Sequence, residues 1–164
     1  MENIFSKSEQ RLIREGFEVI STDFNRPWGG FFVIDENQAQ KFANIYFDGL
    51  NISELKVAGK LSPKLLLVKP GARLSWQYHF RRKETWSIVA GPVGIVRSMT
   101  DEQGDIETFH TNEKVVMKEG ERHRLIGLAN WGVVAEFWQH TDINNPSNEE
   151  DIVRLQDDYQ RSSK

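Results

Sequence analysis

The chain of 164 residues is 38% hydrophobic and 27% charged, contains no cysteine and has a formal net charge of −3 at pH 7. This length is enough for one domain with its own hydrophobic core, and the lack of cysteine excludes disulfides and thiolate metal ligands. The small negative charge argues against a general nucleic-acid or membrane-surface binder.

The first 25 residues are predicted to be a helical extension. Residues 6–16, SKSEQRLIREG, have the spacing of a short amphipathic helix that ends at Gly16. Ser6 is the expected N-cap, and Glu9 stands three residues later, as in a capping box. The chain begins without an apolar segment of signal-peptide length, and no apolar run approaches about 18 residues. We therefore expect a cytoplasmic protein.

A turn and a small helical insertion are predicted next. The segment RPWGGFFVID reads as a turn that leads into a strand. Within residues 37–60, apolar side chains at Phe42, Ile45 and Tyr46 have roughly helical spacing, and Gly49 is a suitable end for that helix.

From residue 64 onward the sequence has the character of an antiparallel β structure. Short apolar or alternating runs follow one another: KLLLVK, RLSWQYHF, ETWSIVA, VGIVRSM, IETFH, KVVMK, HRLIGLA and GVVAEFWQ. Turn residues separate them at intervals of roughly 8–12 residues, which predicts an all-β sandwich or barrel and argues against βαβ units. Residues 141–164 form the tail, for which both a helical start and an extended closing segment fit the pattern.

The stretch LSWQYHFRRKETW combines aromatic and metal-ligating residues. Gln77 and His79 are two apart and share one face of a strand. If residues 80–83 form a hairpin loop, Glu84 returns opposite His79, so that an amide, an imidazole and a carboxylate converge, as at a divalent metal site. His123, in EGERHRL, is the best placed fourth donor. The alternative is a hydrogen-bonded strand histidine beside a surface glutamate.

The spacing of these residues resembles a known signature. Gly-x5-Gln-x-His-x4-Glu-x6-Gly runs from Gly71 to Gly91, and Gly120-x2-His123 follows. This is similar to the two-part cupin signature, with Gln77 where the first histidine usually stands. The segments RPWG, VKPGARLSWQYHFRRKETW, EGERHRL and EEDIVRLQDDYQR occur in the same order as in the type II phosphomannose isomerases, which the chain therefore resembles.

The resemblance implies a fold. We expect one all-β domain with a cupin jelly-roll barrel (double-stranded β-helix) as its core over residues 64–140. The extension at 1–25, the insertion at 37–60 and the closing tail at 141–164 would be added to this core. In many proteins this module follows a mannose-1-phosphate guanylyltransferase. The sequence contains no glycine-rich nucleotide loop, so nucleotide transfer is not expected.

The resemblance also implies metal ligands. The four ligands would be Gln77, His79, Glu84 and His123, and zinc is the first candidate, with manganese, cobalt, nickel or iron as alternatives. Because only one ligand is charged, a divalent ion would keep about one positive charge with which to polarise a carbonyl and stabilise an enediolate.

The remaining site residues also follow from the resemblance. Glu136 would be the base, with Arg154 as its catalytic partner, and Arg26, Arg82 and Arg161 would bind the substrate phosphate. A structural Glu136–Arg154 pair is the alternative reading. The acids of the tail could likewise pair with the arginines and hold the tail in place; they are Asp151, Asp157 and Asp158.

These observations predict a metal-dependent sugar-phosphate aldose–ketose isomerase of the mannose-6-phosphate/fructose-6-phosphate type. Its partner would be a small-molecule sugar phosphate, with no nucleic acid and no membrane, and it could form a homodimer. Thr85 stands where the family commonly has a histidine. A non-catalytic sugar or sugar-phosphate binding cupin is therefore an alternative. Others are an isomerase or epimerase acting on a different sugar, such as a heptose phosphate, and a less favoured metal-dependent oxygenase.

Overall fold

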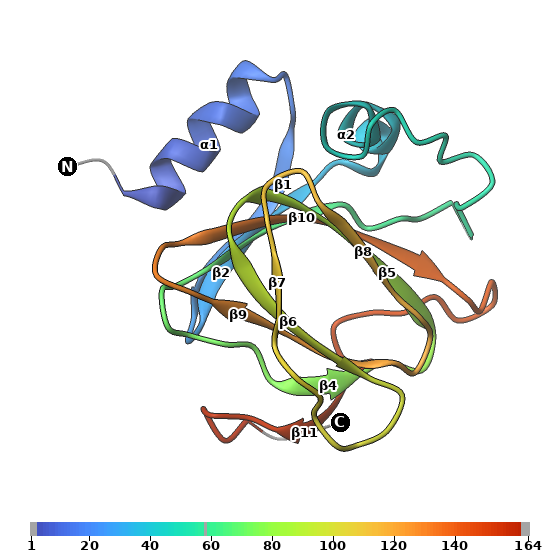
Figure 1. The fold of residues 1–164 in the computed structure, drawn as a ribbon. Coiled ribbons are helices and arrows are strands. Elements are labelled where there is room, and N and C mark those ends of the chain that lie inside the picture. Colours follow the sequence, from blue (N-terminus) through green and yellow to red (C-terminus); the bar gives the residue numbers. More distant parts are fainter. Residues whose placement is uncertain (1–2, 58, 162–164) are drawn as a thin grey trace.

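The computed structural model describes residues 3–57 and 59–161, which form two antiparallel sheets around a common interior (Figure 1). One sheet contains, in spatial order, β1 (Val19–Arg26), β2 (Gly29–Ile34), β3 (Lys64–Val68), β10 (Gly132–His140), β5 (Arg82–Ala90) and β8 (Lys114–Met117). The other contains β11 (Val153–Gln156), β4 (Trp76–Tyr78), β9 (Arg122–Gly127), β6 (Val93–Ser98) and β7 (Glu107–Phe109). This arrangement confirms the predicted all-β jelly-roll barrel.

The N-terminal helix α1 (Ile4–Arg14) begins earlier than predicted. The side chain of Asn3 accepts the N–H of Ser6 at 2.8 Å and is the N-cap, so the predicted capping box at Ser6 and Glu9 is wrong. The predicted end is confirmed, because Gly16 follows the helix with a φ of 82°, which a glycine adopts at little cost. Among the described residues, no helix has the length and apolar character needed to cross a bilayer.

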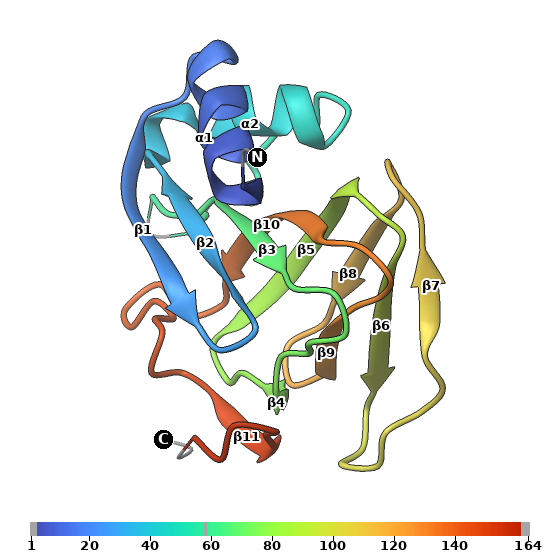
Figure 2. The ribbon, with the colours of Figure 1, turned by 90° about the vertical axis from the view of Figure 1, so that its left-hand side faces the viewer.

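The predicted second helix is present as α2 (Ala39–Tyr46), directly after a short 3-10 turn (Glu36–Gln38). Phe42 and Tyr46 are buried as expected, but Ile45 is 41% exposed and does not belong to the buried face. The ring of Phe42 packs edge-on against that of Phe137 in β10, with centroids 5.3 Å apart. Both helices lie on the same side of the molecule, away from β4 and β11 (Figure 2).

Strand β10 separates two hydrophobic cores. Val133, Ala135 and Phe137 pack in the core that includes the helices, whereas Val134 packs in the core inside the barrel. Because side chains alternate along a strand, Glu136 lies on the same face as Val134 and points into the barrel. The alternation of this one strand therefore decides which polar groups reach the interior.

The predicted hairpin between His79 and Glu84 is wrong. Strand β4 pairs with β9 and β11, whereas β5 pairs with β10 and β8, so residues 79–81 cross from one sheet to the other. The two residues consequently face each other across the barrel rather than across a two-stranded ladder. The tail takes the extended alternative, because β11 pairs with β4 (Figure 2).

Candidate metal centre and its pocket

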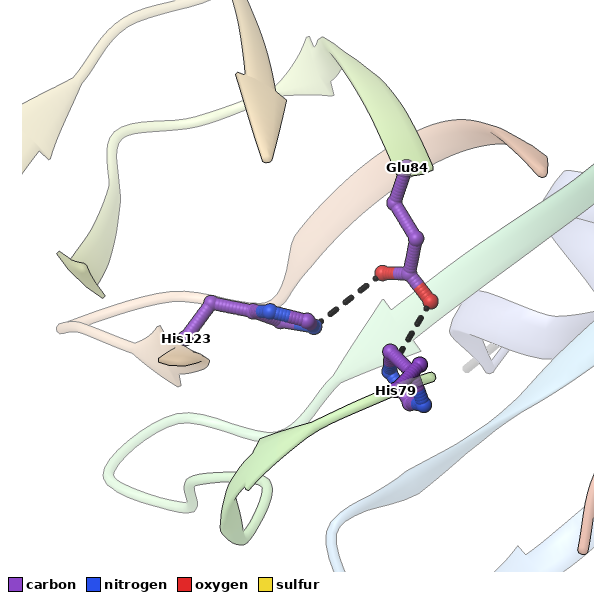
Figure 3. A group of neighbouring side chains, drawn as sticks. All are labelled: His79, Glu84 and His123. Atoms are coloured by element: carbon purple, nitrogen blue, oxygen red, sulfur yellow. Dashed lines mark ion pairs between the residues drawn. The ribbon is translucent and has the colours of Figure 1, made fainter. Parts of the chain in front are cut away.

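Three of the four predicted metal ligands meet inside the barrel. His79 follows β4, Glu84 lies on β5 and His123 lies on β9, and all three side chains are buried. One ligand atom from each lies within 4.8 Å of the others. Glu84 extends one carboxylate oxygen to each histidine, with Oε1 3.2 Å from His79 Nε2 and Oε2 3.2 Å from His123 Nε2 (Figure 3).

Backbone carbonyls orient both imidazoles. Nδ1 of His79 lies 2.6 Å from the carbonyl oxygen of Asp151, and Nδ1 of His123 lies 3.0 Å from that of Glu121. A carbonyl oxygen only accepts, so each Nδ1 carries a hydrogen and each Nε2 faces the Glu84 carboxylate. Within the described residues, His123 Nε2 has no hydrogen-bond partner. A buried nitrogen directed at a carboxylate suits a metal ion, and metal-binding histidines typically donate their other ring N–H to a carbonyl oxygen in this way.

Gln77 lies beside this group but is turned differently. In the β4–β9 ladder Gln77 stands opposite His123, and the side-chain Nε2 of Gln77 is 3.4 Å from His79 Nε2. The Gln77 carbonyl oxygen, which would bind a metal, accepts the Ser75 hydroxyl at 2.6 Å. Rotating the amide by half a turn would direct the oxygen at the site, and the Ser75 oxygen could then accept from the amide nitrogen.

Burial and the neighbouring charges set the protonation states of the three candidate ligands. Burial favours a higher pKa for Glu84, but His79, Arg82 and His123 together outweigh it and hold the pKa of this carboxyl well below its usual range. Burial, reinforced by the positive charge of Arg82, lowers the pKa of His79. Burial also opposes protonation of His123, yet the negative charge of Glu84 raises its pKa. Glu84 and His79 thus have the protonation states that metal binding requires, whereas His123, which Glu84 makes easier to protonate, must be neutral when a metal binds.

Arg82, predicted as a phosphate ligand, makes its contacts within the candidate metal centre. Its guanidinium Nε donates to Glu84 Oε1 at 2.9 Å, and its Nη2 lies 3.2 Å from His79 Nε2. Its Nη1 donates to Ser147 Oγ at 2.9 Å and to the Asn148 carbonyl oxygen at 3.0 Å. Four residues of the protein therefore already hold the Arg82 guanidinium.

A cavity of about 100 Å³ adjoins the candidate metal centre. Gln77, Glu84 and Glu136 line it, together with all four predicted arginines: Arg26, Arg82, Arg154 and Arg161. The structure therefore brings the predicted base and phosphate-binding residues to one pocket beside the predicted metal ligands.

The tail acids hold some of the arginines but not in a single pattern. Asp157 accepts from Arg161 Nε at 2.8 Å, which fits the structural alternative for that arginine. Asp158 instead pairs with Arg73 at 2.7 Å. Asp151 accepts backbone N–H groups of the crossing segment between β4 and β5 and the Ser147 hydroxyl. These contacts attach the tail to the barrel while Arg161 still lines the pocket.

Glu136 is buried and held by two indoles. Trp86 Nε1 donates to Oε2 at 2.8 Å, and Trp138 Nε1 donates to Oε1 at 2.7 Å. Burial, with the nearby charge of Glu84 as the next cause, raises the pKa of Glu136 to about 7. This is the elevated pKa expected of a carboxyl group that faces the barrel interior, and it is suitable for proton transfer near neutral pH.

Thr85 lies on the face of β5 directed away from the pocket. In the β5–β10 ladder Thr85 stands opposite Phe137, which belongs to the core beneath the helices. Its neighbours in sequence, Glu84 and Trp86, pair with Trp138 and Glu136 on the inner face. The departure from the family at this position therefore alters the outer layer of the sheet and leaves the residues of the pocket in place.

Three residues of the site were missed in the sequence. Trp86 and Trp138 donate to Glu136, and alternation along GVVAEFWQ could have placed Trp138 beside it. Lys64 lines the pocket and pairs with Glu149. In the sequence it simply precedes the apolar run LLLV. No local pattern marks Lys64, because its neighbours come from strands that are distant in sequence.

Comparison with known proteins identifies the family and supports the fold. The chain is 29% identical over 137 residues to a mannose-1-phosphate guanylyltransferase of Salmonella montevideo, covering 84% of this chain and 23% of that protein. It is 29% identical over 129 residues to the alginate biosynthesis protein AlgA of Pseudomonas aeruginosa, covering 77% of this chain and 25% of AlgA. The chain thus spans about a quarter of the length of these curated relatives.

A solved structure and a family model support the same fold and family. The capsular polysaccharide assembling protein CapF of Staphylococcus aureus superposes with a TM-score of 0.55 at 16% identity, over 83% of this chain and 34% of CapF. This likeness supports the cupin fold alone. The family model described as mannose-6-phosphate isomerase C-terminal matches residues 40–157, well over half of the chain. The protein therefore belongs to the mannose-6-phosphate isomerase C-terminal domain family, on a cupin barrel.

Proposed function

We propose that this protein is a metal-dependent aldose–ketose isomerase that interconverts sugar phosphates of the mannose-6-phosphate/fructose-6-phosphate type. The observation that carries the proposal is that one pocket contains Glu136, with its raised pKa, beside the His79–Glu84–His123 group. An isomerase needs these two functions next to each other, because a proton must move between carbons while the adjacent carbonyl is polarised.

The metal would be held by His79, Glu84 and His123, with Gln77 as the nearest further donor. Zinc is the first candidate for these nitrogen and oxygen donors, and manganese, cobalt, nickel and iron are alternatives. When bound, the ion supplies positive charge that polarises the sugar carbonyl and stabilises the enediolate.

Glu136 would transfer the proton. With a pKa of about 7, a substantial fraction of its carboxylate is available at neutral pH to take a proton from the hydroxyl-bearing carbon beside the carbonyl and to return it to the former carbonyl carbon. In the same reaction the proton of that hydroxyl passes to the former carbonyl oxygen. The indoles of Trp86 and Trp138 each hold one oxygen, which limits rotation of the carboxylate. The same carboxylate can thus serve as base and then as acid.

The arginines would bind the phosphate and orient the sugar. Arg26, Arg154 and Arg161 line the pocket and come from the N-terminal and C-terminal parts of the chain. A guanidinium binds phosphate oxygens through two parallel N–H groups, so it fixes direction as well as position. Arg154 also lies opposite Gln77 in the β11–β4 pair, which places it next to the proposed reaction centre.

An isomerase acting on a larger sugar, such as a heptose phosphate, is a second candidate. A further cavity of about 350 Å³ shares Lys64, Trp138 and Glu149 with the first pocket. A longer sugar chain could extend past the Lys64–Glu149 ion pair into this space.

We also propose that the protein assembles as a homodimer.

The test is metal analysis of the purified protein followed by isomerase assays on mannose 6-phosphate, fructose 6-phosphate and heptose phosphates. We expect turnover that is lost with a chelator and restored with a divalent metal. Glu136→Gln should lower kcat by roughly 10²–10⁴-fold and retain the metal. Glu107→Gln is the matched control and should leave kcat unchanged, because Glu107 lies on β7 in the other sheet and pairs with Arg97 outside the pocket. Binding of these sugars without turnover by the metal-loaded protein would favour a non-catalytic sugar-phosphate binding cupin.

A further inference from the structure

Arg82 covers metal-facing atoms of the candidate centre. It begins β5 and is only 5% exposed. Its guanidinium Nη2 lies 2.9 Å from Glu84 Oε1 and 3.2 Å from His79 Nε2. Because His79 Nδ1 carries the hydrogen directed at the Asp151 carbonyl, His79 Nε2 has a lone pair that can accept from Arg82. One guanidinium therefore occupies acceptor atoms of two candidate metal ligands.

Several other groups keep the guanidinium in this place. Its Nη1 donates to Ser147 Oγ and to the Asn148 carbonyl, and its central carbon lies 3.6 Å from the centroid of the Trp138 ring. An arginine does not lose its proton in proteins. Arg82 is thus a permanent positive charge that the loop after β10 and the Trp138 ring hold against Glu84.

A divalent metal needs the same lone pairs. Binding of an ion to His79 Nε2 would displace Arg82 Nη2 from that atom, and an ion next to Glu84 would repel the guanidinium. By contrast, no hydrogen bond to Arg82 is formed by His123 Nε2 or Glu84 Oε2 in the described structure. The competition therefore concerns the His79 side of the site.

We propose that Arg82 is an internal cation that competes with the divalent metal for His79 Nε2 and Glu84 Oε1, and so sets the metal affinity of the site. Arg82 is in this sense a positioning residue, because it acts on the metal through the two ligands that it contacts. The inference rests on the proposed function, since it takes His79, Glu84 and His123 as the metal ligands.

The test is a titration of metal-stripped protein with Co²⁺, followed by visible absorption, which reports binding independently of turnover. Arg82→Met keeps an unbranched side chain against Trp138 but removes the competing charge. We expect it to bind Co²⁺ roughly tenfold or more tightly than the wild type, because the metal no longer displaces two hydrogen bonds that involve charged groups. Arg97→Met is the matched control, because Arg97 lies on β6 outside this pocket and pairs with Glu107 at 3.0 Å. The Co²⁺ affinity of this variant should equal that of the wild type.

Arg82→Lys keeps the test decisive if Arg82→Met does not fold, as judged by circular dichroism. An ammonium cannot repeat the forked contact with both ligands, so this variant should bind Co²⁺ with an affinity between those of the wild type and Arg82→Met. A merely structural role for Arg82 would lower thermal stability without tightening Co²⁺ binding. Wild-type binding with no gain in the folded Arg82 variants would overturn this proposal alone. Absence of Co²⁺ binding in every protein, the wild type included, would overturn the metal site as well.

Discussion

Glu136 and Trp86 lie directly opposite each other on β10 and β5, and the Trp86 indole donates to the Glu136 carboxylate at 2.8 Å. Two strands thus place a hydrogen-bond donor against a buried acid. Burial raises the pKa of Glu136, while the Trp86 hydrogen bond opposes that rise because it stabilises the charged form. Without the Trp86 hydrogen bond, Glu136 would remain protonated up to a higher pH.

Trp86→Phe should raise the pKa of Glu136 further. The variant removes one donor to the carboxylate, and a hydrogen bond to a charged group is typically equivalent to about one pKa unit. Carbon NMR titration of the glutamate carboxyl in metal-free protein measures this shift. Trp76→Phe is the control, because the Trp76 indole donates to the Asp101 carbonyl instead. An equal Glu136 pKa in the two variants would contradict the assigned hydrogen bond.

The contribution of Glu136 to the free energy of unfolding of the metal-free protein should fall as pH rises from ~4.3 to about 7 and then level off. The folded pKa of Glu136 is raised to about 7, whereas an unfolded glutamate titrates near ~4.3. The native state therefore binds this proton more strongly, so its stabilising effect is complete below ~4.3 and is lost above the folded pKa. The loss is on the order of 4 kcal/mol.

Urea unfolding between pH 4 and 8 measures this dependence, and Glu136→Gln provides the comparison because it cannot titrate. The difference in free energy between the two proteins should change with pH over that range. A constant difference would show that Glu136 has an ordinary pKa in the folded protein.

Replacement of either metal-facing histidine should abolish metal binding. His79→Ala and His123→Ala each remove one of the three buried ligand atoms. We expect metal content after dialysis to fall to a small fraction of the wild-type value in both variants. His110→Ala is the matched control, since His110 is exposed and outside this group. Full metal occupancy in both site variants would contradict the ligand assignment.

Arg26→Met should raise KM for the sugar phosphate about tenfold and leave kcat largely unchanged. Arg26 lies at the end of β1, lines the pocket and would contact a phosphate that is equally present in the ground and transition states. Steady-state kinetics separate the two constants. Arg73→Met removes a comparable charge that is paired with Asp158, and it should change neither. A fall in kcat with no change in KM would place Arg26 at the reacting carbons instead.

Several features of the fold and site were accessible from the sequence because they depend on local spacing. Alternation in GVVAEFWQ places Glu136 on the face of β10 opposite to Phe137, and helical spacing predicts α2. The Gln77-x-His79-x4-Glu84 spacing and the distant His123 predicted residues that do converge. The domain boundaries, the insertion at 37–60, the homodimer and the cytoplasmic location stay predictions.

Other features were decided by tertiary structure. The sequence alone suggested a hairpin between His79 and Glu84, since four intervening residues fit such a loop, but their strands lie in opposite sheets. Arg82 lines the pocket, and its predicted role in phosphate binding stays a prediction, but its polar contacts with Glu84, His79 and the loop at 147–148 could not be predicted from the sequence.

What the sequence by itself determined is therefore the period of most elements, the side chains that share a face in strands such as β10, and the family to which the spacing belongs. Only the tertiary structure decided which faces meet, and so which charges share the interior with Glu84 and Glu136. The physical reason is that periodicity is a property of neighbouring residues. Burial, the raised pKa of Glu136 and the contacts of Arg82 arise instead from groups that come together only when two sheets close around one space.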